Sequence, residues 1–432
     1  MLRRKFYDVM LDWKNKKKKE CLLVKGARQI GKTYIIQKFG KENYKTFVYL
    51  NFVENPQYKT IFDGALTAEE IYKKLSVFVS GLKLYENDTL IFLDEIQECP
   101  NARTALKFLA IDDRYDVIAS GSLLGINYKE VPSIPVGYEK QVEMFSLDFE
   151  EFLWALGVDD QAISYVKSFF IKQEKVPPEV NEKMHEYLRD YIVVGGMPDV
   201  VNAFIKSKNY NDVQEAQEKI INSYYEDMIK YAPNADKPKV RRCFDSIPKQ
   251  LSKENKKFQY SVVERGGTAR KYGNSLDWLD DANVIEKIHN VFAPQVPLKA
   301  YEREEQFKVY MNDIGLLVAT YGFELKAFII QKTLKGSAKG GIYENLIADI
   351  LTKRGYKLNY YKPDNNAQEI EFLITTADGV IPIEVKSGNE ATVSLNNYME
   401  IFKPSRAYKL IDGNVGKSGI KITLPLYMAA FI

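Results

Sequence analysis

The chain has 432 residues, enough for about three domains, and its 45% hydrophobic and 28% charged residues are typical of a globular protein. Lys and Arg number 61 and Asp and Glu 58, so the net charge of +3 does not by itself indicate a nucleic-acid partner. Only two histidines are present, and Cys21, Cys99 and Cys243 match no metal-binding spacing. The odd cysteine count without a secretory signal predicts a cytoplasmic protein, and no apolar run is long enough to predict a membrane span.

The first third of the chain alternates short apolar runs with helical stretches. The spacing of Phe6, Met10 and Trp13 predicts an amphipathic first helix. After it, alternating strands and helices are typical of a parallel sheet with helices on both faces. Strands are expected at 21–25, 47–51, 89–94 and 116–120, with a further candidate at 144–146, and helices at 33–39, 68–79 and 101–109.

A glycine-rich loop joins the first expected strand to the next helix. Its residues are Gly26, Ala27, Arg28, Gln29, Ile30, Gly31, Lys32 and Thr33. Small residues let backbone N–H groups approach phosphates, the lysine reaches the β- and γ-phosphates, and the threonine hydroxyl binds Mg²⁺. The helix that follows adds the partial positive charge of its first turn. Strand, loop and helix together predict a site for ATP and Mg²⁺.

Polar residues at the ends of two later strands support this site. Asp94 ends an apolar strand and would hold Mg²⁺, while Glu95 would orient or deprotonate the attacking water. Ser120 or Ser122 could contact the γ-phosphate or that water, and a simple strand-to-loop turn is the alternative. The cation that the transition state needs is not identified. The candidates are Arg28, Arg103 and Arg114.

The middle of the chain is predicted to be helical from about 149 to 230, with a compact turn at Gly195–Pro198. Two helices and a strand follow, in winged-helix order, at 258–263, 268–279 and 284–291. The turn and basic helix start from Arg265 to Tyr272 suit contact with DNA. They equally suit a protein–protein module of the same shape.

The C-terminal part predicts a further α/β region. A helix is expected at 343–353 and strands at 358–361, 369–374 and 380–385. The Asp378-Gly379 turn predicts a hairpin between the last two strands. Glu384 and Lys386 are two residues apart and therefore lie on one face of a strand, and the hairpin can bring Glu371 beside them.

In this order, the motifs resemble those of a family of prokaryotic AAA-type ATPases with a C-terminal DUF4143 domain. The matching segments are 27–33, 93–97, 120–122, 147–153, 195–198 and 312–317. The resemblance covers about residues 3–388 and implies ATP binding, with hydrolysis expected. One departure is Tyr138, because family members often carry Arg or Lys there; Lys140 is a candidate substitute.

The family's C-terminal region resembles a PD-(D/E)XK nuclease fold. The resemblance implies a second Mg²⁺ held by Glu371 and Glu384, with Glu344 and Lys386 nearby. Glu371 stands where the usual motif has Asp, and its longer side chain would move the metal. Three interpretations are open: a working nuclease, a relic or DNA-binding scaffold without catalysis, and a solvent-facing Glu-x-Lys strand.

The predicted fold is α/β, with a P-loop parallel sheet, a helical lid, a winged-helix module and a C-terminal nuclease-like α/β domain. The expected bounds are 1–155, 156–232, 233–305 and 306–432. We expect a Mg²⁺-dependent ATPase whose nucleotide state controls C-terminal domains that act on DNA. The alternatives are an ATP-dependent switch that binds protein partners, with an inactive nuclease-like domain, and an ATP-gated nuclease. Expected partners are ATP, then DNA, a second copy or another protein, and no membrane.

Overall fold

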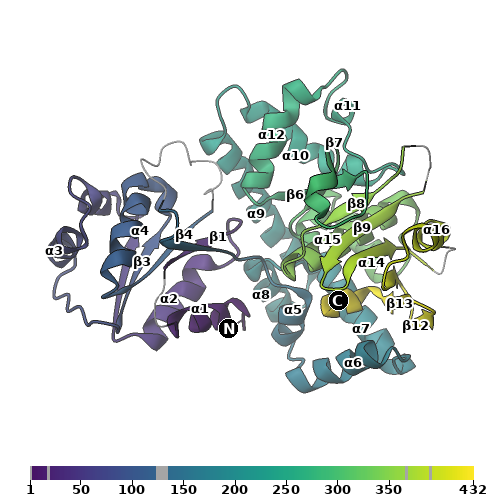
Figure 1. Cartoon of the computed structure of the whole chain (residues 1–432), viewed down its shortest axis with the longest axis horizontal. Helices are drawn as coiled ribbons and strands as arrows, with labels where there is room; N and C mark the ends of the chain where they lie inside the picture. Colours follow the sequence, from purple (N-terminus) through teal and green to yellow (C-terminus); the bar gives the residue numbers. More distant parts are fainter. Residues whose placement is uncertain (1, 17–19, 123–134, 365–367, 389–391) are drawn as a thin grey trace. The chain divides into compact units, whose positions relative to one another are not determined.

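A computed structural model of the protein describes residues 2–16, 20–122, 135–364, 368–388 and 392–432 (Figure 1). The chain forms two compact units. The first contains residues 3–146 and 281–283, and the second contains nearly all of the rest. Each unit is described by itself below.

The first unit contains a parallel five-stranded sheet. Its strands lie in the order β2-β3-β4-β1-β5, and neighbouring strands are parallel. They are β1 (Cys21–Lys25), β2 (Thr46–Asn51), β3 (Thr89–Asp94), β4 (Asp116–Gly121) and β5 (Glu139–Glu143). Four strands confirm the prediction, whereas the fifth precedes the expected segment at 144–146. Its sequence, EKQVE, is polar and at most half-buried, so this edge strand gives no apolar signal.

Helices cover both faces of this sheet (Figure 1). They are α1 (Phe6–Lys14), α2 (Lys32–Asn43), α3 (Ala68–Phe78) and α4 (Pro100–Asp112). Helices α3 and α4 pack on the face that carries Leu23, Leu50 and Leu93, in one buried cluster. Helix α2 contacts β2, β3 and β4. Side chains alternate along each strand, so both faces need apolar residues, and this produces the nearly continuous apolar strands of the sequence.

The second unit begins with the helices expected in the middle of the chain. They are α5 (Phe149–Ala155), α6 (Asp160–Lys172), α7 (Pro178–Val194), α8 (Pro198–Ser207) and α9 (Tyr210–Tyr231). Helix α5 packs against α7 and α8. Residues 147–155, which were expected in the ATPase domain, therefore belong to the second unit.

An eight-stranded mixed sheet lies in the second unit, in the order β12-β13-β11-β10-β9-β8-β6-β7. Its strands are β6 (Ile285–Val291), β7 (Glu302–Met311), β8 (Asn359–Tyr361), β9 (Ile370–Thr376), β10 (Gly379–Val385), β11 (Ala407–Ile411), β12 (Gly416–Ser418) and β13 (Lys421–Pro425). Strands β9 and β10 form the expected hairpin, with Thr376 opposite Gly379.

The segment expected to form a winged helix contributes its hairpin to this same sheet. Helices α10 (Lys237–Leu251), α11 (Tyr260–Val263) and α12 (Ala269–Asp281) precede the antiparallel pair β6–β7. Strand β6 also pairs with β8 in parallel. The expected boundary between residues 305 and 306 therefore falls inside β7. Alternating polarity predicts a strand but not the sheet that the strand joins.

Four further helices complete the second unit. They are α13 (Ile314–Thr320), α14 (Glu324–Ile330), α15 (Gly336–Lys353) and α16 (Val393–Phe402). Helix α15 starts at Gly336, before the expected residue 343. The sequence did not predict these first turns because they contain three glycines, which are poor helix formers.

Several of the family-like segments meet around Leu147, the residue that begins the second unit. The backbone N–H of Leu147 donates to the Gly196 carbonyl at 2.7 Å. Its carbonyl accepts from the Tyr191 hydroxyl at 2.9 Å and from Lys353 Nζ at 3.1 Å. Asp313 in turn accepts from the Gly196 N–H at 2.8 Å. Residues 147–153, 195–198 and 312–317 are therefore parts of one structural joint.

We expect Gly196→Ala to destabilise the second unit by about 1–3 kcal/mol or more, as overpacking does. A Cβ at Gly196 would overlap the backbone of Leu147, which is held in place on both sides. The matched control is Gly273→Ala in α12, where a Cβ meets nothing within 4 Å. It should be neutral or slightly stabilising. Urea unfolding of both variants measures this, and equal stabilities would contradict the prediction.

Candidate functional site

The loop between β1 and α2 has the backbone that its glycines predict. Gly26 and Gly31 have φ angles of +148° and +89°, in the region that favours glycine. A Cβ at Gly26 would overlap the carbonyl of Met144. The loop is therefore held against the segment that follows β5. Sequence reasoning missed a second support: Arg4 donates to the Ile30 carbonyl at 3.0 Å and to the Phe145 carbonyl at 2.6 Å.

Lys32 is the first residue of α2 and is buried. Its Nζ donates to the Gly26 carbonyl at 2.9 Å and to the Ala27 carbonyl at 2.7 Å. The ammonium group thus lies against the loop itself. This is the position from which a lysine can reach a phosphate that the loop binds.

Asp94 is the centre of the polar contacts at the carboxyl ends of the strands. Its Oδ2 accepts from the Thr33 hydroxyl at 2.9 Å, from the Tyr49 hydroxyl at 3.1 Å and from Asn51 Nδ2 at 3.3 Å. Its Oδ1 accepts from the Ser120 hydroxyl. Asn51 and Ser120 are the register partners of Asp94 on β2 and β4. Parallel register therefore brings together residues that are far apart in the sequence.

The structure distinguishes the two serines of the prediction. Ser120 reaches Asp94, whereas Ser122 is buried and has no side-chain hydrogen bond to Asp94 or Glu95 among the described residues. Tyr49 and Asn51 were not predicted as site residues. Their spacing of two on β2, beside a strand that ends in an acid, is the signal that could have found them.

Glu95 follows β3 with a left-handed backbone, at φ +54°. Such a conformation is uncommon for a residue with a side chain. Gln97 Nε2 donates to Glu95 Oε2 at 2.5 Å.

The arginine candidates are engaged inside the first unit. Arg103 forms a buried ion pair with Glu139 at 2.8 Å, so it is held within its own fold. Arg114 pairs with Asp112 at 3.0 Å. Arg28 lies on the glycine-rich loop itself and is half-buried.

Mg²⁺ fits the donors present here. Thr33 and Asp94 supply hard oxygen ligands, which Mg²⁺ prefers. The Thr33 hydroxyl already donates its hydrogen to Asp94, so its lone pairs are free to face a cation beside the loop. These oxygen donors therefore suit a Mg²⁺ ion beside the loop.

The C-terminal carboxylates form a second polar cluster, built on β9, β10 and α15. Lys386 Nζ lies 3.5 Å from Glu371 Oε1 and 3.2 Å from Glu384 Oε1. Glu371 Oε2 accepts from the backbone N–H of Val385 at 3.3 Å. Burial raises the pKa of Glu371 to about 7, against the opposing effect of Lys386, and burial also raises the pKa of Glu384. The structure thus brings together Glu371, Glu384 and Lys386, as the hairpin predicted.

Glu344 points to a different set of partners. Its carboxylate lies 2.9 Å from Lys256 Nζ and 3.3 Å from Lys308 Nζ, and it accepts from the Tyr310 hydroxyl at 3.1 Å. Burial opposes ionisation, but the two lysines keep the pKa of Glu344 below its usual value. Glu344 therefore ties α15 to β7 and to the segment after α10.

The second Mg²⁺ that the resemblance implies would have to share this cluster with lysines. Lys386 lies between Glu371 and Glu384, and Glu344 is neutralised by lysines. In the parts of the chain that the structure describes, no group of three or more His, Cys, Asp or Glu side chains is arranged to hold a metal. One buried oxygen, Glu384 Oε2, has no hydrogen-bond partner there. The second Mg²⁺ at Glu371 and Glu384 stays a prediction.

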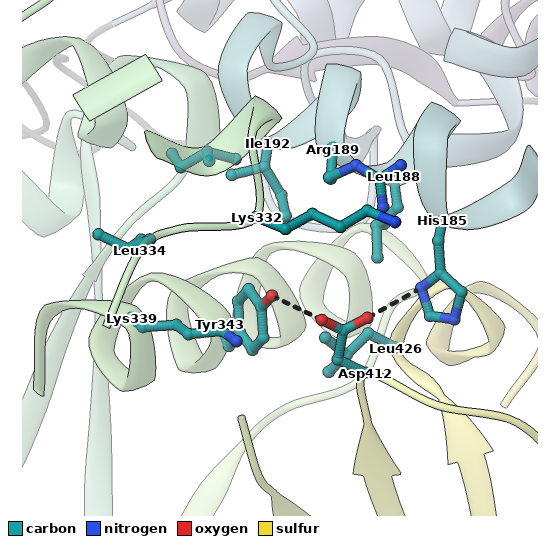
Figure 2. A pocket seen from close by; sticks show the side chains of 11 residues that line it. His185, Leu188, Arg189, Ile192, Lys332, Leu334, Lys339, Tyr343, Asp412 and Leu426 are labelled. Atoms are coloured by element: carbon teal, nitrogen blue, oxygen red, sulfur yellow. Dashed lines mark hydrogen bonds and ion pairs between the residues drawn. The ribbon is translucent and has the colours of Figure 1, made fainter. Parts of the chain in front are cut away.

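A recess in the second unit is lined mainly by α7, α15 and the loop after β11 (Figure 2). Asp412 lies between two walls, 3.3 Å from His185 Nδ1 and 3.5 Å from the Tyr343 hydroxyl. Arg189, on the same helix as His185, pairs with Glu182 at 3.2 Å. The contacts of Asp412 with His185 and Tyr343 connect α7 to α15 through the loop after β11.

Comparisons with known proteins agree with the fold of the first unit. Residues 18–153 match the family profile of an AAA domain. Residues 339–426 match a domain of unknown function, DUF4143, and residues 185–327 match another, DUF8612. Most of the first unit therefore resembles an AAA domain, and its parallel sheet is consistent with that match. The DUF4143 match begins well after the expected boundary at residue 306.

Two relatives are similar over most of the chain. An uncharacterized protein of Methanocaldococcus jannaschii is 24% identical over 370 residues, which is 82% of this chain and 71% of the relative. An uncharacterized protein of Haemophilus influenzae is 23% identical over 412 residues, 90% of this chain and 91% of the relative.

Two solved structures are similar at lower identity. A Walker-type ATPase of Pyrococcus abyssi has 14% identity and a TM-score of 0.43, with 74% of this chain and 96% of that one covered. The Orc1 protein of Aeropyrum pernix, in complex with DNA, has 12% identity and a TM-score of 0.30, with 77% and 93% covered. Within the described ranges, no helix combines the length and hydropathy needed to cross a membrane.

We expect the free energy of unfolding of the wild type to decrease as pH rises from about 5 to about 8, compared with that of Glu371→Gln at the same pH. The folded state, with its raised pKa of about 7, keeps a proton on Glu371 that the unfolded chain has released. Stability is therefore lost as pH rises, by on the order of 1–3 kcal/mol. Urea unfolding at both pH values measures the difference.

The matched control for this pH effect is Glu369→Gln. Burial opposes ionisation of Glu369, but Lys308 and Lys362 outweigh it and lower its pKa to about 2. Its contribution to stability should therefore stay constant over the same pH range. If the free energies of unfolding of the wild type and Glu371→Gln differ by the same amount at both pH values, the raised pKa of Glu371 is contradicted.

Proposed function

We propose that the protein is a Mg²⁺-dependent ATPase whose nucleotide state controls an action of its C-terminal part on DNA. The observation that carries the proposal is the 2.9 Å hydrogen bond from Thr33 on the glycine-rich loop to Asp94 at the end of β3. It joins the loop that would bind phosphates to the acid that would hold the metal. Glu95 directly follows this acid, where an acid suits hydrolysis rather than binding alone.

In this proposal the phosphates lie against the backbone N–H groups between Gly26 and Thr33. Lys32 exchanges its contacts with the Gly26 and Ala27 carbonyls for phosphate oxygens. Thr33 and Asp94 would hold Mg²⁺, which supplies charge neutralisation for the phosphates. Glu95 accepts a proton from the attacking water.

We expect Lys32→Ala to lose ATP binding, because it removes the buried cation of the loop. Glu95→Gln should bind ATP but hydrolyse it at least about 100-fold more slowly, because an amide cannot accept the proton. Nucleotide binding by fluorescence and phosphate release measure the two effects. The control is Lys41→Ala, an exposed change on the same helix. Normal hydrolysis by both site variants would refute the ATPase.

The segment α10–α12 with the hairpin β6–β7 supports an action on DNA. Three helices before a hairpin are the winged-helix order. Arg270 and Lys271 are exposed at the start of α12, and Arg265 is exposed in the turn before it. A basic helix start of this kind can contact phosphates. Lys271 is held by Glu264, so the exposed Arg270 is the better contact to test.

We expect the protein to bind duplex DNA with an affinity that falls steeply with salt, and Arg270→Glu to weaken binding about tenfold or more. Lys206→Glu on α8 is the control, with the same charge change at an exposed site away from α12. Fluorescence anisotropy at several salt concentrations measures this. Absence of binding at low salt would leave the switch that binds protein partners.

A nuclease is the second candidate function, supported by the assembly of Glu371, Glu384 and Lys386. The same DNA samples incubated with Mg²⁺ serve as its test. Cleavage that is lost in Glu384→Ala would support it. Intact DNA with several metals would leave a scaffold without catalysis.

A further inference from the structure

The short 3₁₀ turn η2 (Ile96–Glu98) carries a glutamine directly after the acid that we place in hydrolysis. Gln97 is buried, and its Nε2 lies 2.5 Å from Glu95 Oε2. Only the amide N–H end can face a carboxylate, since the amide oxygen would repel it. The orientation of the Gln97 side chain is therefore fixed by chemistry.

This hydrogen bond is the side-chain contact that holds the acid. Among the residues described by the structure, the Glu95 carboxylate has no other hydrogen-bond donor and no cation as partner. Asp94, its neighbour, receives side-chain donors from three other elements. Without Gln97, no side-chain hydrogen bond among the described residues would hold the carboxylate of Glu95.

A contribution to the stability of the fold does not explain a glutamine at position 97. Its Oε1 is buried and has no hydrogen-bond partner within the described residues. A buried polar atom left without a partner destabilises the folded state. An apolar side chain of the same length would avoid this cost, so the benefit of glutamine must lie in the contact with Glu95.

We propose that Gln97 is a positioning residue of the ATPase, which holds the carboxylate of Glu95 in the orientation that accepts the proton of the attacking water. The inference rests on the proposed ATPase function. The Gln97 side-chain N–H donates to Glu95 Oε2, so Glu95 Oε1 is left to accept from the water. The left-handed backbone of Glu95, at φ +54°, limits the directions that its side chain can take, and Gln97 selects among them.

The test is Gln97→Met, which keeps the length of the side chain and removes both polar ends. We expect kcat for ATP hydrolysis to fall about tenfold or more, as loss of a hydrogen bond to a charged group does. KM for ATP should change less than about twofold, because Gln97 does not contact the nucleotide. The melting temperature should be unchanged or higher. Gln97→Leu is a second variant, which tests the inference if methionine packs poorly at this position.

The chain offers a matched control in Gln141→Met. Gln141 Nε2 donates to Glu139 Oε1 at 2.6 Å, with the same spacing of two residues, but at an exposed position on β5. This variant should keep the kcat of the wild type. A kcat of the wild type in both Gln97 variants would overturn the inference.

A double-mutant comparison separates positioning from a general structural effect. If Gln97 acts through Glu95, Gln97→Met should cause no further loss of kcat in the Glu95→Gln background. An equal further loss there would overturn the inference while the ATPase proposal stands. Normal hydrolysis by Glu95→Gln alone would remove the role of Glu95 and the inference with it. Normal hydrolysis by Lys32→Ala as well would overturn the ATPase proposal, so the two failures can be told apart.

Discussion

The buried carboxylate of Asp94 is the interaction on which the candidate site of the first unit depends. Donors from the first turn of α2, from β2 and from β4 converge on its two oxygens. They can do so because parallel strands end at the same edge of the sheet, where Asn51, Asp94 and Ser120 are register neighbours. The glycine-rich loop before α2 is in turn held by Arg4 and by the backbone after β5. The position of each residue of the candidate site is therefore linked to the sheet.

The second unit depends on a different kind of contact, between segments that are distant in sequence. The hairpin β6–β7 extends the sheet of the C-terminal strands, and Lys308 on β7 reaches Glu344 on α15. The joint around Leu147 adds contacts from α7 and from α15. The second unit is thus one fold rather than a series of separate modules, and the DUF8612 and DUF4143 matches meet within it.

The two acidic clusters differ in how their charge is balanced. Asp94 is surrounded by neutral donors, which hold the carboxylate without cancelling its charge, so that a cation can still be attracted. Glu344, by contrast, is paired directly with lysines, and Lys386 lies between the other two carboxylates. Neutral donors suit a site for metal and nucleotide, whereas lysine partners suit a site that is held together without one. This contrast supports ATP chemistry in the first unit more strongly than metal chemistry in the second.

The sequence by itself determined the glycine-rich loop, four of the five strands of the first sheet, the helical middle and the hairpin that carries Glu371 and Glu384. These features are local: a loop needs its glycines, and a buried strand needs its apolar run. The tertiary structure alone decided what depends on register and packing. Examples are Tyr49 and Asn51 at Asp94, Gln97 at Glu95, and the hairpin β6–β7 in the C-terminal sheet. The physical reason is that alternation along a strand gives the face of each side chain, but not the strand that will lie beside it.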